Sequence, residues 1–272
     1  MRVIICANDD SVAKEAYKLV RSCVVNQGAK VLGLPTGSTP VKLYREIVAG
    51  FKRAEIDFSD VHTFNLDEYL GLPVEHEQSY RNFMIQKLFK HINIKPENIN
   101  FLDGLTDDLE GECASYEAKM EELGGIKLQI LGIGRDGHIG FNEPGTPLSA
   151  RTGFVTLAAE TIEDNKRFFA SAAEVPRWAL SMGVGTILEA REILMLATGS
   201  NKAEAIAGMV EGPITAMNTA SALQMHEKVT LIVDEAAASK LERKDYYRRT
   251  GTDNIAEMYA YLMNARKKAG LD

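Results

Sequence analysis

The chain of 272 residues is poor in cysteine and has no long apolar run. Its three cysteines, Cys6, Cys23 and Cys113, show neither the spacing of a disulfide framework nor that of a zinc site. No stretch approaches the roughly 20 apolar residues of a membrane helix, and the apolar stretch at the amino terminus is too short for a signal peptide. These absences predict a cytoplasmic protein in a reducing compartment, without a membrane partner.

An excess of positive charge is also absent. The 31 basic and 38 acidic residues give a net charge of −7, which argues against binding to nucleic acid or to an anionic membrane. Basic residues cluster only at 243–249 and 266–268, where a solvated helix face is the simpler interpretation. The composition, 45% apolar and 25% charged, is typical of a globular protein. A small molecule is therefore the expected partner.

Short apolar runs alternate with helical patterns from one end of the chain to the other. This alternation indicates an α/β protein with a mostly parallel sheet covered on both faces. No linker or internal repeat interrupts it, so residues 1–272 are expected to form a single domain. Within that domain, 160–178 is a candidate lid, and the residues from about 240 are expected to fold back as a helical cap.

Chemistry-bearing residues are densest in the stretch 128–147. An apolar run at 128–133 closes on glycine and is followed within a few residues by Asp136, His138 and Glu143. Residues just past the carboxyl end of a strand lie where open α/β sheets bind ligands. An imidazole oriented and charged by two carboxylates can move protons near neutral pH. A histidine that is merely hydrogen-bonded within a turn remains the alternative.

Two cofactor interpretations of this stretch are weaker. Gly132, Gly134 and Gly137 formally match the dinucleotide pattern G-x-G-x-x-G, but the glycines and prolines that follow forbid the helix which that motif opens. Two carboxylates and one histidine resemble a non-haem iron site in residue type, but no second histidine lies nearby in the sequence. We therefore expect neither a cofactor nor a metal.

A phosphate site is predicted from a second turn. Gly37, Ser38 and Thr39 follow an apolar strand and precede a helix, an arrangement that presents backbone N–H groups and the helix dipole to an anion. A capped turn without a ligand is an equally good interpretation of this segment alone. Lys202, in a similar turn, and Arg167 could contribute charge to the same phosphate.

Two carboxylates, Asp67 and Glu68, follow the apolar strand predicted at 61–66. Their position at a carboxyl strand end again indicates the ligand side of the sheet, although either could serve only as a cap or in an ion pair. Asp67 offers an isolated base. A phosphate site with two separate proton-transfer units suits proton abstraction next to the carbonyl of a sugar phosphate, without a redox cofactor.

Six segments together resemble one enzyme family, the isomerising glucosamine-6-phosphate deaminases. They are LGLPTGSTP at 32–40, TFNLDEYLGLP at 63–73, GIGRDGHIGFNEPG at 132–145, KRFF at 166–169, MGVGTILEAR at 182–191 and GSNKA at 199–203. The similarity runs in register to about Asp234. The related 6-phosphogluconolactonases share G-x-G-x-D-G-H but continue with a Ser-Leu-Phe-Pro type segment, whereas this chain continues with IGFNEP.

The resemblance implies a three-layer α/β/α, Rossmann-like fold and a reaction that converts glucosamine 6-phosphate to fructose 6-phosphate and ammonia in the catabolism of amino sugars. By its position, Asp67 would move the proton from C2 to C1. Asp136, His138 and Glu143 would open the pyranose ring, with His138 as the proton carrier at the ring oxygen.

The resemblance also implies a substrate-binding set. The turn at Gly37, Ser38 and Thr39 would hold the 6-phosphate together with Arg167 and Lys202. Glu68, beside the proposed base, is expected among the substrate-binding residues.

Two alternatives on the same fold remain open. One is a lactonase and the other a non-catalytic sugar-phosphate sensor, although this chain begins in a strand rather than in a DNA-binding helical module and carries all four acid–base residues.

One departure from the family concerns regulation. Activator-regulated members carry basic residues just after their S-R-T segment, which bind N-acetylglucosamine 6-phosphate at a subunit interface. This chain has Gly153, Phe154 and Val155 there. We therefore expect no such activation. A homo-oligomer is conceivable, and the sequence leaves the oligomeric state open.

Overall fold

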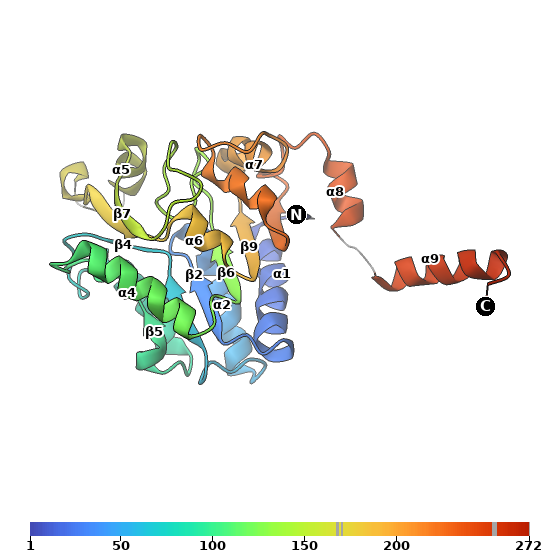
Figure 1. Ribbon diagram of the computed structural model, residues 1–272, viewed down its shortest axis with the longest axis horizontal. Coiled ribbons are helices and arrows are strands. Elements are labelled where there is room, and N and C mark those ends of the chain that lie inside the picture. Colours follow the sequence, from blue (N-terminus) through green and yellow to red (C-terminus); the bar gives the residue numbers. More distant parts are fainter. Residues whose placement is uncertain (167–168, 170, 252–254, 272) are drawn as a thin grey trace.

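A seven-stranded parallel sheet forms the centre of the computed structural model, which describes residues 1–166, 169, 171–251 and 255–271 (Figure 1). Every pairing between the described strands of this sheet is parallel. In spatial order the strands are β1 (Arg2–Cys6), β10 (Val229–Asp234), β9 (Glu192–Ala197), β6 (Leu128–Leu131), β2 (Val31–Leu34), β3 (His62–Asn65) and β5 (Ile99–Asn100). The predicted mostly parallel sheet is confirmed.

Helices cover both faces of this sheet and make the three-layer α/β/α architecture (Figure 1). Successive residues of a strand point to opposite faces, so in β10 Leu231 and Val233 join one apolar core and Ile232 joins the other. The core that contains Ile232 packs against α1 (Asp9–Arg21), α2 (Ser38–Lys52) and α3 (Tyr80–Lys87). The other core packs against α4 (Leu109–Glu122), α6 (Val184–Leu188), α7 (Ala203–Val210) and α8 (Lys244–Thr250).

Short helical turns complete the connections between these elements. They are the π-helical η1 (Ser22–Asn26) and the 3₁₀ turns η2 (Phe89–His91), η3 (Pro96–Asn98), η5 (Ala172–Glu174), η6 (Ser200–Lys202) and η7 (Thr219–Met225).

A second, antiparallel sheet of three strands lies beside the first. Its order is β4 (Asp67–Tyr69), β8 (Trp178–Ser181) and β7 (Gly153–Thr156), and the helix α5 (Ala159–Asn165) follows β7. The sequence did not predict this sheet, because a three-residue strand is too short to show a periodic pattern. Its effect on the site is direct: Asp67 opens β4 immediately after β3, where the chain passes from one sheet to the other.

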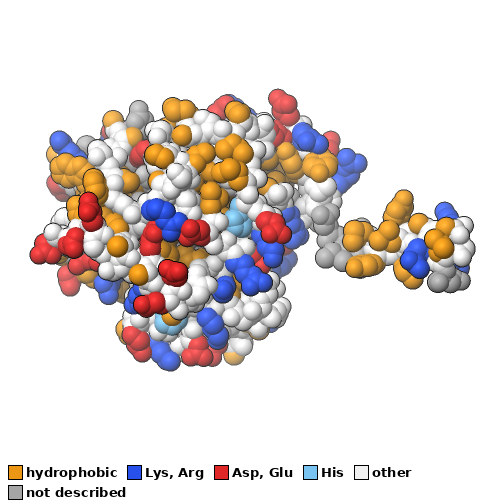
Figure 2. Space-filling view, viewed as in Figure 1, with side chains coloured by type: hydrophobic (Ala, Val, Ile, Leu, Met, Phe, Trp, Pro, Cys, Tyr) orange, Lys and Arg blue, Asp and Glu red, His pale blue; other side chains and the backbone are white. Residues whose placement is uncertain are grey.

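The C-terminal region divides into two parts. Helix α8 packs near β1, where the Arg2 side chain donates from Nε to the carbonyl oxygen of Gly251 at 2.9 Å. Helix α9 (Ile255–Lys268) extends away from the body, and residues 258–271 are exposed (Figures 1 and 2). The predicted fold-back of the whole segment is therefore wrong for α9, which buries no side chain at 258–271 and so gains no burial energy to hold it against the body.

Among the described residues, no helix is both long and apolar enough to cross a bilayer.

Candidate active site

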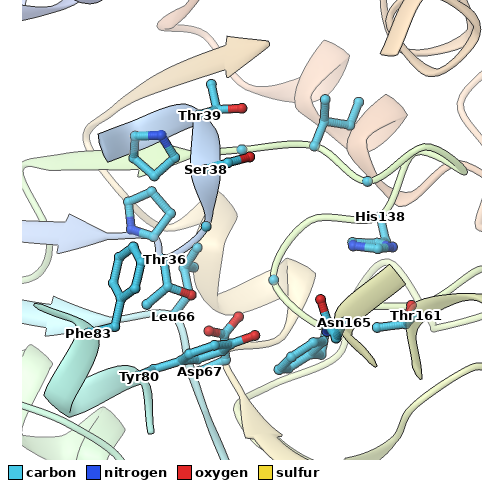
Figure 3. A pocket seen from close by; sticks show the side chains of 18 of the residues that line it. Thr36, Ser38, Thr39, Leu66, Asp67, Tyr80, Phe83, His138, Thr161 and Asn165 are labelled. Atoms are coloured by element: carbon cyan, nitrogen blue, oxygen red, sulfur yellow. The ribbon is translucent and has the colours of Figure 1, made fainter. Parts of the chain in front are cut away.

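A cavity of about 430 Å³ opens at the carboxyl ends of the neighbouring strands β9, β6, β2 and β3 (Figure 3). Its volume lies within the range of roughly 300–1,000 Å³ that is usual for small-ligand sites. The loops that leave these four strands contribute Lys202, His138, Ser38 and Asp67 to the lining. Segments distant in sequence therefore meet at one edge because parallel strands align their carboxyl ends.

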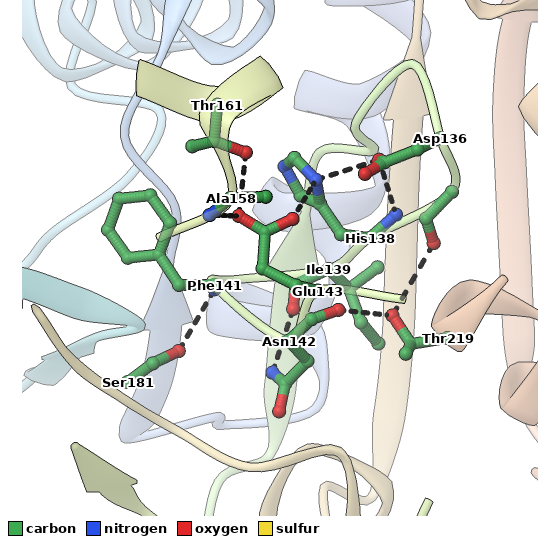
Figure 4. A network of polar contacts seen from close by, with 11 residues as sticks. Asp136, His138, Ile139, Phe141, Asn142, Glu143, Ala158, Thr161, Ser181 and Thr219 are labelled. Atoms are coloured by element: carbon green, nitrogen blue, oxygen red, sulfur yellow. Dashed lines mark hydrogen bonds and ion pairs between the residues drawn. The ribbon is translucent and has the colours of Figure 1, made fainter. Parts of the chain in front are cut away.

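Asp136, His138 and Glu143 lie together, as predicted (Figure 4). Nδ1 of His138 is 2.8 Å from Oδ1 of Asp136 and 3.5 Å from Oε2 of Glu143. Of the three, His138 lines the cavity, whereas the two carboxylates stand behind it. With Nδ1 turned to the acids, Nε2 is the ring nitrogen on the cavity side.

The glycines of this loop permit close packing around the imidazole. A Cβ on Gly134 would lie 2.4 Å from Cε1 of His138 and 2.6 Å from Oδ1 of Asp136, distances that no real side chain tolerates. The backbone N–H of Gly134 also donates to the carbonyl of His138 at 2.8 Å. The loop thus folds as a tight turn and not as the helix of a dinucleotide site.

The two acids hold a positive charge on the imidazole. Burial alone would lower the pKa of His138, but the carboxylates of Asp136 and Glu143 outweigh it and raise that pKa to about 9. Burial alone would raise the pKa of Asp136, but the imidazolium of His138 outweighs burial and lowers that pKa to about 2. The pKa of Glu143 is also lowered, since His138 and Thr161 together outweigh its burial. At neutral pH this wall of the cavity therefore presents a proton donor.

Asp67 stands on another wall of the same cavity (Figure 3). Only 7% of its surface is exposed, because it lies at the junction of the two sheets. Burial, and then the nearby charge of Glu68, raise the pKa of Asp67 to about 7, while His138 acts in the opposite direction. A carboxylate with this pKa is suited to accept and return a proton near neutral pH.

Glu68 is not among the described residues that line the cavity, so the structure shows no support for the predicted substrate contact. Its buried carboxylate accepts the backbone N–H groups of Tyr69, Tyr80 and Arg81, each at 2.9 Å. Two of these groups belong to the first turn of α3, whose N–H groups have no partner inside the helix. Glu68 thus fixes α3 beside the cavity.

The predicted phosphate turn forms the far end of the cavity from Asp67 (Figure 3). Gly37 has a φ of 106°, a left-handed conformation that favours glycine, and α2 begins at the next residue without a side-chain cap. The hydroxyl of Tyr44, in α2, donates a hydrogen bond to the carbonyl oxygen of Pro35 and so stabilises the turn. The first turn of α2, with Ser38 and Thr39, therefore borders the cavity, and the backbone N–H groups at a helix N-terminus can bind an anion.

The structure describes only one of the two basic residues that were predicted to bind the phosphate. Lys202 lines the cavity. Arg167 lies outside the described residues. A further basic residue, Arg135, also lines the cavity and was missed, although its place in the glycine-rich loop next to Asp136 was a usable signal.

Aromatic side chains, also missed, form one side of the cavity. The ring centroids of Tyr69 and Tyr80 are 4.7 Å apart, and Tyr80 stacks on Phe141 at 5.9 Å. The hydroxyl of Tyr69 accepts a hydrogen bond from Asn165 of α5 at 2.9 Å. These residues come from four separate segments, so no local pattern could have grouped them.

The histidine cluster also meets a loose geometric criterion for a metal. One donor atom from each of Asp136, His138 and Glu143 lies within 4.8 Å of the other two. The contact of 2.8 Å between nitrogen and oxygen is equally that of an ion pair with a protonated ring, in which both imidazole nitrogens are donors and cannot bind a metal. The expectation that no metal takes part stays a prediction.

Comparison with known proteins gives closely similar relatives. Residues 7–232 match the family model described as glucosamine-6-phosphate isomerases/6-phosphogluconolactonase. A glucosamine-6-phosphate deaminase from Hahella chejuensis is 50% identical over 96% of this chain and 100% of its own length. Another from Clostridioides difficile is 50% identical over 90% of this chain and 99% of its own length.

Solved structures give the same result. A structure described as a monomeric glucosamine-6-phosphate deaminase superposes with a TM-score of 0.86 and 41% identity, over 88% of this chain and all of that one. A 6-phosphogluconolactonase from Trypanosoma cruzi, 20% identical with a TM-score of 0.71 over 89% of this chain and 97% of its own, shares the fold. From the family match and the 50% identical relatives, this chain belongs to the glucosamine-6-phosphate isomerase/6-phosphogluconolactonase family.

Proposed function

We propose that the protein is an enzyme that converts glucosamine 6-phosphate and water to fructose 6-phosphate and ammonia. One observation carries the proposal: the imidazole of His138, with two carboxylates beside its Nδ1, and the buried carboxyl group of Asp67 stand on different walls of one cavity (Figure 3). The relatives of 50% identity that bear the name of this deaminase support it.

The binding step uses the two ends of the cavity. The 6-phosphate would lie at the first turn of α2 beside Ser38 and Thr39, within reach of Lys202. The sugar ring would then lie along Tyr80, between Asp67 and His138. In this orientation the ring oxygen of the substrate, a cyclic hemiacetal, would face the imidazole.

Ring opening is assigned to His138. Its imidazolium donates a proton to the ring oxygen as the C1–O bond breaks, and a water molecule takes up the proton of the C1 hydroxyl. An aldehyde remains at C1, and the neutral imidazole can take a new proton from solvent. Asp136 and Glu143 keep the imidazole charged for this step. A positioned acid of this kind typically contributes about 10²–10⁴-fold in rate.

Isomerisation is assigned to Asp67. The C1 aldehyde makes the C2 proton acidic, so the carboxylate can remove it while O1 takes a proton from water, which gives an enolamine. The carboxyl group then returns its proton to C1 as the nitrogen gives one up to water, which gives a ketimine at C2. Water adds to the ketimine, ammonia leaves, and the C2 ketone of fructose 6-phosphate remains. The individual steps are proton transfers and a hydrolysis, with no net exchange of electrons with a cofactor.

The test is direct. The purified protein is incubated with glucosamine 6-phosphate, and both ammonia and fructose 6-phosphate are measured, with Asp67→Asn and His138→Asn as controls that should lose nearly all turnover. Equal amounts of the two products support the proposal. Hydrolysis of 6-phosphogluconolactone without release of ammonia would establish the lactonase instead, and binding without turnover would establish a sensor.

We further infer that the enzyme works in the cytoplasm as one catalytic domain. The three cysteines are free thiols, two of them buried, which suits a reducing compartment. Phosphorylated sugars are also substrates that cells keep inside. Fractionation of cells that produce the protein, with the activity followed in each fraction, checks the location.

A further inference from the structure

Helix α5, within the candidate lid, reaches the charged cluster behind the cavity (Figure 4). The hydroxyl of Thr161 donates to Oε1 of Glu143 at 2.6 Å. The backbone N–H of Ala158, just before the helix, donates to the same oxygen at 3.3 Å. Thr161 is only 6% exposed, and it also lines the cavity. The carboxylate of Glu143 is thus held by α5 at one of its two oxygens.

The second oxygen of Glu143 is left for the imidazole. Oε2 is buried, lies 3.5 Å from Nδ1 of His138, and makes no hydrogen bond with any residue that the structure describes. A carboxylate fixed at one oxygen by two donors has lost its freedom to rotate, so the direction of the other oxygen is set. The donors of α5 therefore determine whether Glu143 faces His138.

We propose that Thr161 is a positioning residue for ring opening. Its hydroxyl orients Glu143 toward His138, so ring opening depends on whether α5 is packed against Glu143. This inference rests on the proposed deaminase function and deepens it. Thr161 acts through Glu143 and takes no part in the bond changes itself. When α5 moves away, Glu143 loses both donors, and the imidazole loses one of its two acidic partners at the same time.

Three variants test the proposal in the full-length protein. Thr161→Val removes the hydroxyl and keeps the side-chain shape, whereas Thr161→Ser keeps the hydroxyl. Thr63→Val is the matched control, since Thr63 is also buried and its hydroxyl has no hydrogen-bond partner among the described residues. We expect kcat for glucosamine 6-phosphate to fall about tenfold or more in Thr161→Val, with KM changed less than about threefold, because a hydrogen bond to a charged group is lost. Thr161→Ser and Thr63→Val should stay near the wild type.

An open-chain inhibitor shows whether Thr161 acts through Glu143 in ring opening or only contacts the ligand as part of the cavity wall. A 2-amino-2-deoxyhexitol 6-phosphate has no ring to open, so its inhibition constant should be the same in wild type and Thr161→Val. If its binding weakens as much as kcat falls, Thr161 is merely part of the cavity wall and the proposal fails. It fails also if Thr161→Val keeps the wild-type kcat, or if Thr161→Ser is as impaired as Thr161→Val.

A measurement without substrate keeps this inference separate from the proposed function. The imidazole of His138 faces Asp136 and Glu143 and also senses Asp67 across the cavity. Its titration, followed by NMR, should move to lower pH in Thr161→Val and return in Thr161→Ser. If the His138 titration shifts in Thr161→Val but the wild type releases no ammonia, only the proposed function is overturned. If the wild type turns over normally and Thr161→Val shows neither a shift nor a loss of kcat, only the role of Thr161 is overturned.

Discussion

Oε1 of Glu68 lies 2.9 Å from the backbone nitrogen of Tyr80, so the acid next to Asp67 caps the helix that forms one side of the cavity. Its other oxygen accepts the N–H of Arg81, and the hydroxyl of Ser79 accepts that of Asn82. The first turn of α3 is therefore fully paired. The same buried charge raises the pKa of Asp67. Glu68 thus links the position of α3 to the basicity of the proposed catalytic base.

The variant Glu68→Gln tests this link. An amide at this site turns an NH₂ group toward backbone N–H donors, so we expect stability to fall by about 1–3 kcal/mol. Loss of the negative charge should also move the acidic limb of the kcat/KM profile to lower pH. Thermal unfolding and rates from pH 5 to pH 8 measure both effects. Glu75→Gln, at an exposed position nearby, is the control, and an unmoved acidic limb would refute the link.

The pH dependence of kcat/KM should be bell-shaped. Asp67 must be ionised to accept the C2 proton, so the rate rises as pH increases through about 7. His138 must be protonated to open the ring, so the rate falls as pH increases through about 9. Steady-state rates between pH 5 and pH 10 check both limbs. A profile without an alkaline limb would remove His138 from the role of acid.

The alkaline limb should depend on Asp136. In Asp136→Asn the imidazole loses the partner at 2.8 Å, so its pKa falls and the limb moves to lower pH. At pH 8 we expect kcat to fall about 10²-fold, at the lower end of what a positioned acid contributes. Asp107→Asn, which removes an exposed acid, should leave both the limb and the rate as in the wild type.

The buried charge of Asp67 should destabilise the folded protein at neutral pH. Its folded pKa of about 7 exceeds its ordinary value of 3.8, so the folded form binds the proton more tightly, and stability falls as pH rises from about 4 to 7. Asn at this position carries no charge to desolvate. We expect Asp67→Asn to raise Tm at pH 8, by about 2–4 °C per kcal/mol recovered, and to raise it less at pH 5. An equal gain at both pH values would contradict this origin.

Activation by N-acetylglucosamine 6-phosphate is not expected. By the family resemblance, the basic residues of activator-regulated members correspond to Gly153 and Val155 here, and the side chain of Phe154 between them on β7 is largely exposed. Without positive charge at this strand, a phosphate-bearing activator has no partner there. Initial rates should follow a hyperbola, with or without the compound, and sedimentation measures the oligomeric state alongside. Sigmoidal kinetics that the compound abolishes would contradict the prediction.

The glycine-rich loop after β6 shows how much a local sequence pattern can predict. The run of apolar residues that ends at Gly132 predicted a central strand, and β6 is found there. The grouping of Asp136, His138 and Glu143 was also predictable, because a tight turn brings side chains within eight positions together. The burial of Asp67 could be hypothesised from the role of a base, but its cause could not, since it depends on β4 pairing with β8, more than 100 residues further along the chain.

The sequence by itself predicted the parallel sheet, the glycine-rich turn before α2 and the grouping of Asp136, His138 and Glu143, because each depends on neighbours within a few positions. Only the tertiary structure decided that Glu68 caps α3, that Thr161 of α5 holds Glu143, and that α9 stands apart from the body. These features depend on contacts between distant segments, and on which apolar surfaces find a partner. Hydrophobic periodicity and residue propensity indicate which secondary structure a segment can form. The pKa of a buried group depends instead on the residues that pack around it.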